Sequence, residues 1–214
     1  MAFPQGVYFR STDNQTDPTN YDAEITGLLD SNYPTSSAQG NTIGWEGILH
    51  DKVDRDVTAD VRLKGVHYGA LTDINDYRID LPATGVYIIR AAMGDSGFPH
   101  PNRLRIVDTT TVVVDNDAGD VSSDQFADAT GVIRTSESDW VNNNASIQVG
   151  FSTTICRFRF GGSTGTSDPN WTVNAIYIEA AAGGAAQTFL LNPPRLDGVG
   201  HGGIFPGSRI PRTG

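Results

Sequence analysis

The chain has 214 residues, a net charge of −10 and an isoelectric point near 4.6. This acidity weighs against a nucleic-acid or anionic-membrane partner, since both require clustered cations. No apolar run approaches the roughly 18 residues of a membrane-spanning helix, and the length suits one large domain or one and a half small ones. The acidic residues are 21 Asp and only 4 Glu, beside 24 Gly. Asp and Gly favour turns whereas Glu favours helices, so the composition predicts strands joined by turns.

Short apolar or alternating segments follow one another along the chain between turn residues. We expect strands at 6–10, 42–45, 65–68, 77–81, 86–93, 103–107, 111–114, 131–134, 145–151, 155–160 and 171–179. Residues 77–81 and 86–93 flank the turn sequence Pro82-Ala83-Thr84-Gly85, which predicts a β-hairpin. No convincing amphipathic helix separates the strands. The expected fold class is therefore all-β, an antiparallel jelly-roll β-sandwich.

Cys156 is the only cysteine, which excludes an intramolecular disulfide framework and a cysteine zinc cluster. It lies in the alternating run 155–160, where we expect a small core residue and not a reactive thiol. Residues 1–20 contain no basic segment followed by an apolar stretch, so we expect no secretory signal.

The composition changes at Gly183. Residues 183–214 hold 8 of the 24 Gly and 4 of the 11 Pro and carry a charge of +2, which leaves −12 on residues 1–182. We expect a sandwich body at 1–182 with a loop-rich N-terminal part, and an extended arm at 183–214, with a flexible tail as the alternative. The candidate partner-binding residues of the arm are Phe189, Leu190, Leu191, Arg195, Ile204, Phe205, Arg209, Ile210 and Arg212.

The tetrapeptide Gly94-Asp95-Ser96-Gly97 follows a predicted strand and resembles the Gly-Asp-Ser motif of lipase-like hydrolases. That resemblance would make Ser96 the nucleophile and His201 its base. Asp197 lies four positions before His201, whereas the family separates its Asp and His by three positions. A strand-end turn explains the same residues, because Gly and Asp suit turns. We therefore expect no catalytic residues and no enzyme, with a serine hydrolase as the remote alternative.

Asp115, Asp117 and Asp120 place oxygen ligands at intervals typical of a calcium loop. Gly119 and Asp120 stand where the EF-hand pattern has an oxygen ligand and then a glycine, and no Glu follows at the twelfth position. The favoured interpretation is an acidic hairpin turn, so we expect no cofactor, with calcium as the alternative. The four histidines lack the spacing of metal ligands.

The three tryptophans lie in different sequence contexts. Trp45 and Trp171 lie in predicted strands and are expected in the core. Trp140 follows the polar residues 135–139 and precedes three Asn residues, which predicts a polar loop. We therefore expect Trp140 to be exposed and to be the candidate glycan contact.

The stretch from Tyr77 to Arg90, with the following Gly94-Asp95, resembles the hairpin of malectin-like and galactose-binding-like carbohydrate-binding sandwiches. A narrower resemblance, to virion-associated proteins of tailed bacteriophages, rests on residues 43–46, 60–67 and 151–154. The first resemblance implies a galactose-binding-like β-sandwich, similar to a carbohydrate-binding module. It transfers no defined sugar site to this sequence.

The second resemblance implies a non-enzymatic virion structural protein, made in the host cytoplasm and located in the virion. We expect a capsid decoration or minor capsid subunit that self-associates and is anchored by the arm to the major capsid protein or another virion protein. The alternative is a carbohydrate-binding, host-attachment module of a phage tail or fibre, with a host glycan as partner. Neither nucleic acid nor a membrane is an expected partner.

Overall fold

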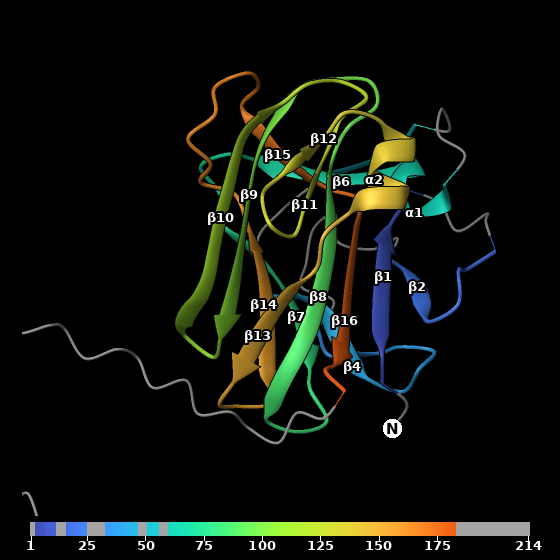
Figure 1. The fold of residues 1–214 in the computed structure, drawn as a ribbon, viewed down its shortest axis with the longest axis vertical. Coiled ribbons are helices and arrows are strands. Elements are labelled where there is room, and N and C mark those ends of the chain that lie inside the picture. Colours follow the sequence, from blue (N-terminus) through green and yellow to red (C-terminus); the bar gives the residue numbers. More distant parts are fainter. Residues whose placement is uncertain (1–2, 12–15, 25–32, 47–50, 56–59, 183–214) are drawn as a thin grey trace, which may run out of the picture.

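The computed structural model describes residues 3–11, 16–24, 33–46, 51–55 and 60–182. In these residues two β-sheets face each other, and a smaller third sheet crosses one end of the pair (Figure 1). Among the described strands, every pair of neighbours is antiparallel except β1 with β2. The all-β sandwich expected from the sequence is confirmed.

The seven-stranded sheet has the order β12 (Ile133–Arg134), β11 (Phe126–Asp128), β8 (Gly85–Gly94), β16 (Ala175–Ala180), β1 (Gln5–Phe9) and β2 (Tyr21–Glu24), and β13 (Ile147–Phe151) also pairs with β8. The six-stranded sheet has the order β10 (Thr111–Val121), β9 (His100–Asp108), β14 (Ile155–Phe160), β7 (Asn75–Asp80), β4 (Thr42–Glu46) and β3 (Thr35–Ser36). The small sheet has the order β15 (Asn170–Val173), β6 (Gly65–Ala70) and β5 (Asp51–Asp54). The helices are α1 (Val61–Lys64) and α2 (Glu137–Asn143).

Aromatic side chains fill the space between the two large sheets. The ring of Trp45 lies 5.1 Å from that of Tyr77, 5.4 Å from that of Phe9 and 6.0 Å from that of Trp171, measured between ring centroids. Trp45 and Trp171 are 2% and 1% exposed, which confirms their prediction as core residues. Burying a large apolar side chain contributes roughly 1.5–3 kcal/mol.

The predicted hairpin between β7 and β8 is wrong. β7 pairs with β4 and β14 in the six-stranded sheet, whereas β8 belongs to the seven-stranded sheet. The turn at residues 81–84 therefore crosses from one sheet to the other, and the amide of Leu81 donates to the carbonyl of Thr154. An alternating pattern shows that each strand has one buried face, but two strands of one hairpin and two strands facing each other across a core produce the same pattern.

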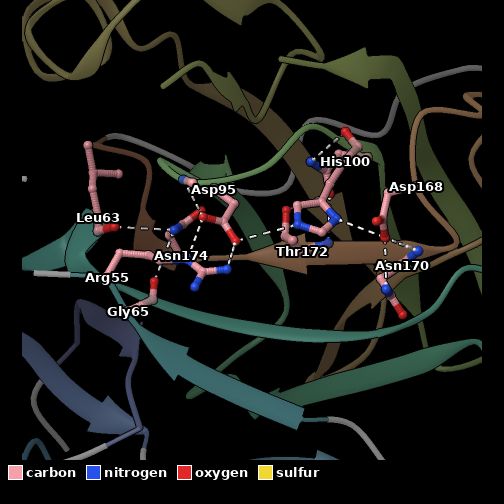
Figure 2. Close-up of polar contacts among 11 residues, drawn as sticks. Arg55, Leu63, Gly65, Asp95, His100, Asp168, Asn170, Thr172 and Asn174 are labelled. Carbon is pink, nitrogen blue, oxygen red and sulfur yellow. Dashed lines mark hydrogen bonds and ion pairs between the residues drawn. The ribbon is translucent and has the colours of Figure 1, made fainter. Parts of the chain in front are cut away.

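The strand predicted at 171–179 is two strands in different sheets. β15 and β16 are separated at Asn174, whose side chain is buried and donates to the carbonyl oxygens of Leu63 at 3.4 Å and Gly65 at 2.9 Å (Figure 2). The Asn174 backbone amide donates to the carbonyl of Ala92. These bonds hold the chain where it passes from the small sheet to the seven-stranded sheet. The sequence pattern continues across Asn174, so it does not reveal that the strand is interrupted there.

Cys156 lies on β14 and is fully buried, as predicted. Burial raises the pKa of its thiol well above the ordinary value. Because the thiolate is the reactive form, we expect no labelling of the native protein by a thiol reagent such as DTNB, and rapid labelling in urea. Labelling of the native protein at the rate of a free thiol would contradict this burial.

Both helices are short and begin at a capping side chain. Asp60 accepts a hydrogen bond from the amide of Arg62 in α1, and Ser136 accepts one from the amide of Asp139 in α2. The sequence patterns predicted neither helix, because each has too few residues to show an amphipathic period. Within the described ranges, no helix is long and apolar enough to cross a membrane.

Candidate functional site

The loop that joins β8 to β9 carries a buried carboxylate. Asp95 has a side chain only 1% exposed, and its two oxygens accept hydrogen bonds from Arg55 Nε at 2.7 Å and Nη2 at 2.6 Å (Figure 2). Oδ1 of Asp95 also accepts a bond of 2.7 Å from the amide of Gly97. A Cβ at Gly94 would lie 2.2 Å from the carbonyl oxygen of Gln125, so this end of β8 requires a glycine. The strand-end turn predicted here is confirmed.

His100 ties this loop to a third segment of the chain. Its Nε2 lies 3.4 Å from Asp95 Oδ2, and its Nδ1 lies 3.3 Å from Asp168 Oδ1 (Figure 2). Asp168 precedes β15, and its Oδ1 also accepts a hydrogen bond from the amide of Asn170 at 2.8 Å. Charged and polar contacts therefore connect the end of β5, the β8–β9 loop and the segment before β15.

Ionisation of Asp95 makes the stability of the domain depend on pH. Burial raises the pKa of this carboxyl, but hydrogen bonds from His100 and Arg55 outweigh burial and hold the pKa well below its usual value. The unfolded carboxyl has a pKa of about 3.9. The stabilisation is therefore fully present above about pH 4 and is lost as the pH falls through the folded-state pKa.

Asp95→Asn is expected to lower the free energy of unfolding by about 2 kcal/mol at pH 7. In urea titrations the difference in free energy of unfolding between wild type and variant should narrow between about pH 4 and pH 2, because the unfolded carboxyl binds its proton at a higher pH than the folded one. Asp115, whose side chain is 42% exposed and pairs with Arg103, is the matched control, and Asp115→Asn should cost less than about 1 kcal/mol. Equal losses for the two variants, or a difference that does not narrow in acid, would contradict the buried pair.

Phe98 stands at the tip of the same loop and is 55% exposed. The guanidinium carbon of Arg55 lies 5.0 Å from the centroid of its ring, within the range of a cation–π contact. Arg55 is itself fixed by both oxygens of Asp95, and Pro99 restricts the backbone after the ring. The aromatic ring is therefore both accessible and held in place.

Polar groups of the small sheet lie beside this loop. The hydroxyl of Tyr68, on β6, donates to Asp51 Oδ2 at 3.1 Å, and Asp51 is exposed at the start of β5. Burial, the bond to Asp51 and the charge of Asp95 raise the pKa of the Tyr68 hydroxyl, and the charge of Arg55 opposes them. We call Phe98, Arg55, Tyr68, Asp51 and Asp168 the Phe98 surface. It combines an exposed ring with hydrogen-bonding groups, which suits a ligand that has both an apolar face and hydroxyl groups.

The prediction that Trp140 is exposed is wrong. Trp140 is 2% exposed and lies on α2, and its Nε1 donates to the carbonyl of Ala91 on β8 at 3.1 Å. The guanidinium carbon of Arg62 lies 5.1 Å from its ring centroid. The polar neighbours of Trp140 occupy the outer side of α2, whereas the tryptophan faces the sheet, so local polarity was misleading.

Ser96 has no described partner that could act as its base. Its hydroxyl oxygen is buried and makes no hydrogen bond, and both ring nitrogens of His100 lie near carboxylates. His67 directs Nε2 to the carbonyl of Arg10 at 3.0 Å. His201 and Asp197, the partners predicted for a hydrolase, lie outside the described residues.

The segment that contains the calcium candidates lies in β10, so the predicted hairpin turn is wrong there. Asp115 pairs with Arg103, whereas Asp117 accepts from Ser163 and Thr164, and Asp120 accepts from Thr166 and Ser167. The described part of the chain holds no group of three or more potential ligands for a metal ion. A bulge that ends at Gly119 explains the turn-like composition, because the φ of Gly119 is +65°.

The nine residues predicted to form the partner-binding arm lie outside the described residues, as does the domain boundary at 183.

Phe98 was not among the residues predicted from the sequence, although Gly97-Phe98-Pro99 offered a signal. An aromatic residue between glycine and proline, directly after a strand, has no alternating neighbours with which to join the core.

Neither a known family model nor a curated protein matches the chain. Solved structures similar to it include a Bacteroides uniformis beta-glucuronidase 2, at 15% identity and a TM-score of 0.44, over 84% of this chain and 18% of that one. A family 35 carbohydrate binding module from Clostridium thermocellum is 14% identical, with a TM-score of 0.38, over 68% of this chain and 96% of that one.

A CBM36-1 domain of a multidomain xylanase, from the hindgut metagenome of Trinervitermes trinervoides, is 10% identical, with a TM-score of 0.37, over 66% of this chain and 98% of that one. This chain thus spans less than a fifth of the glucuronidase and nearly the whole of each binding module. Similarities of this size assign no function to it, and the resemblance to phage virion proteins stays a prediction.

Proposed function

We propose that this chain is a non-catalytic saccharide-binding module and that the Phe98 surface is its binding site. The observation that supports this proposal is the exposed ring of Phe98, fixed by Arg55 and Asp95. A ring that is already held in place loses little conformational freedom when a ligand stacks on it. The apolar face of a sugar ring fits such a platform, and the hydroxyl groups at its edge find donors and acceptors around it.

The charge of the surface favours a neutral saccharide over an acidic one. Arg55 is neutralised by Asp95, while Asp51 and Asp168 add carboxylates at the rim. The chain as a whole carries −10. An acidic polysaccharide would therefore meet repulsion on approach and at the site.

Affinity electrophoresis of the full chain tests the proposed function. Gels would contain a soluble neutral glucan, mannan, xylan or galactan, and parallel gels would contain alginate. We expect slower migration in at least one neutral polysaccharide and unchanged migration in alginate. Unchanged migration in every neutral polysaccharide would overturn the proposal.

Attachment to a virion through residues 183–214 stays a separate proposal. Ala181, directly after β16, donates its amide to the carbonyl of Val86, so the last described residues still belong to the sandwich. Removal of 183–214 should leave a folded body that no longer joins an assembly. Normal incorporation of the shortened chain into particles would contradict the anchoring role.

A further inference from the structure

A groove of about 500 Å³ opens on the outer face of the six-stranded sheet. Residues of β4, β7 and β14 and of the turn after β7 line it: Thr42, Arg78, Asp80, Leu81, Pro82, Thr154 and Ile155. The turn after β7 that lines it precedes the first residue of β8, whereas the Phe98 surface follows the last residue of β8. Strand β8 runs along the length of the sandwich (Figure 1). β8 has 10 residues, and a strand rises about 3.3 Å per residue, so the two places are on the order of 30 Å apart.

Arg78 forms one wall of the groove and is fixed on three sides. Its Nε donates to Asp80 Oδ1 at 2.7 Å, and its Nη1 donates to Glu46 Oε1 at 3.1 Å. Its guanidinium carbon lies 4.2 Å from the ring centroid of Tyr33, whose hydroxyl donates to Asp80 Oδ2 at 2.9 Å. Among the described residues, Nη2 of Arg78 has no hydrogen-bond acceptor. Two N–H groups on a fixed guanidinium are therefore available to a ligand.

The charges around Arg78 balance. Glu46 bridges Arg78 and Arg157, and Asp80 pairs with Arg78, so two guanidinium groups face two carboxylates. Burial raises the pKa of Glu46, but hydrogen bonds from Arg157 and Arg78 lower it below the usual value, so the carboxylate stays charged at neutral pH. A wall without net charge attracts no ion over a distance and favours a ligand that both donates and accepts hydrogen bonds.

The rest of the groove lining is apolar or carries hydroxyl groups. Leu81 is buried, Ile155 is half-buried and Pro82 is exposed, and together they present hydrocarbon to the groove. Thr42 and Thr154 add hydroxyl groups. A volume of about 500 Å³ lies within the range of small-molecule sites, roughly 300–1,000 Å³.

We propose that this groove is a second saccharide site, in which a neutral sugar ring lies with its apolar face on Pro82 and Ile155 and its hydroxyl groups on Arg78 and Asp80. The inference rests on the proposed function, since it assigns the same class of ligand to a second place. Two sites at opposite ends of the sandwich would let one domain hold two segments of a polysaccharide, so that the second binding step becomes intramolecular.

Titration of the isotope-labelled full chain with neutral trisaccharides of glucose, mannose, xylose or galactose tests both sites at once. Amide signals of Thr42 and Ile155 report on the groove, and those of Gly97 and Phe98 report on the Phe98 surface. We expect one of these trisaccharides to shift both sets of signals, and Phe98→Ala to leave the groove shifts in place. Shifts at Gly97 and Phe98 alone would overturn the groove and leave the proposed function standing. Shifts at the groove alone would overturn the Phe98 surface as the binding site and leave the groove standing. The absence of a saturable shift at both places would overturn both assignments.

Two variants test the groove itself. Thr154→Trp fills it from an exposed position and should weaken binding there by about tenfold or more, equivalent to about 1.4 kcal/mol. Thr110→Trp, exposed on the turn between β9 and β10, is the matched control and should leave binding within about twofold. Arg78→Lys keeps the charge and removes the fork of donors, and should also weaken binding. Binding by Thr154→Trp and Arg78→Lys equal to the wild type would overturn the groove assignment.

Discussion

Trp140→Ala should destabilise the domain by about 3–5 kcal/mol, the range found for removal of a large buried aromatic side chain. The ring is 2% exposed, packs between α2 and β8, and donates its indole N–H to the carbonyl of Ala91. The variant would leave a cavity under α2 and a carbonyl oxygen without its donor. Urea unfolding followed by tryptophan fluorescence or circular dichroism measures the loss.

Val141 offers the matched control for this variant, because it follows Trp140 on α2 and is 39% exposed. Val141→Ala should change the free energy of unfolding by less than about 0.5 kcal/mol. Trp140→Phe keeps most of the ring volume and removes the hydrogen bond, so its stability should lie between that of Trp140→Ala and that of the wild type. Wild-type stability in Trp140→Ala, with saccharide binding lost, would favour the exposed glycan contact that the sequence predicted.

Phe98→Ala should leave the fold intact and weaken saccharide binding at the Phe98 surface by at least about tenfold. The ring is exposed and contacts Arg55, so its removal takes little from the core and should change the free energy of unfolding by less than about 0.5 kcal/mol. Phe98→Tyr and Phe98→Trp keep an aromatic face and should retain binding. Isothermal titration with the saccharide identified by electrophoresis gives the dissociation constants.

Val113→Ala is the control for this loss, because Val113 is another exposed apolar residue, 39% exposed, on β10. Its dissociation constant should equal that of the wild type. An equal affinity of Phe98→Ala and Val113→Ala at the Phe98 surface would show that the aromatic ring contributes nothing to binding there.

The sequence predicted most of the strands and three of their core residues, but not how the strands combine. Trp45, Trp171 and Cys156 were predicted as core residues from their positions in expected strands, and all three are buried. Pairing of β7 with β8 could not be settled by alternation, since the period is the same for strands in one sheet and in two facing sheets. The break at Asn174 depends on the carbonyl groups of Leu63 and Gly65, more than a hundred residues away.

The candidate site was predictable in part. The turn at Asp95 followed from turn chemistry, because Asp and Gly serve that role locally. The partners of Asp95 and His100 did not follow from it, since Arg55 and Asp168 come from segments 40 or more residues away from Asp95 in the chain. For Trp140, local polarity predicted exposure, but a helix presents different residues to solvent and to the sheet, so neighbours in sequence do not share an environment.

The most direct test of the binding site is the amide chemical-shift map of the full chain with a saturating neutral saccharide. We predict saturable shifts at Gly97, Phe98 and Tyr68 that fit a single dissociation constant. In Phe98→Ala the dissociation constant reported by Gly97 and Tyr68 should rise by at least about tenfold. Saccharide binding with no shift at Gly97, Phe98 or Tyr68 would contradict the assignment of the Phe98 surface.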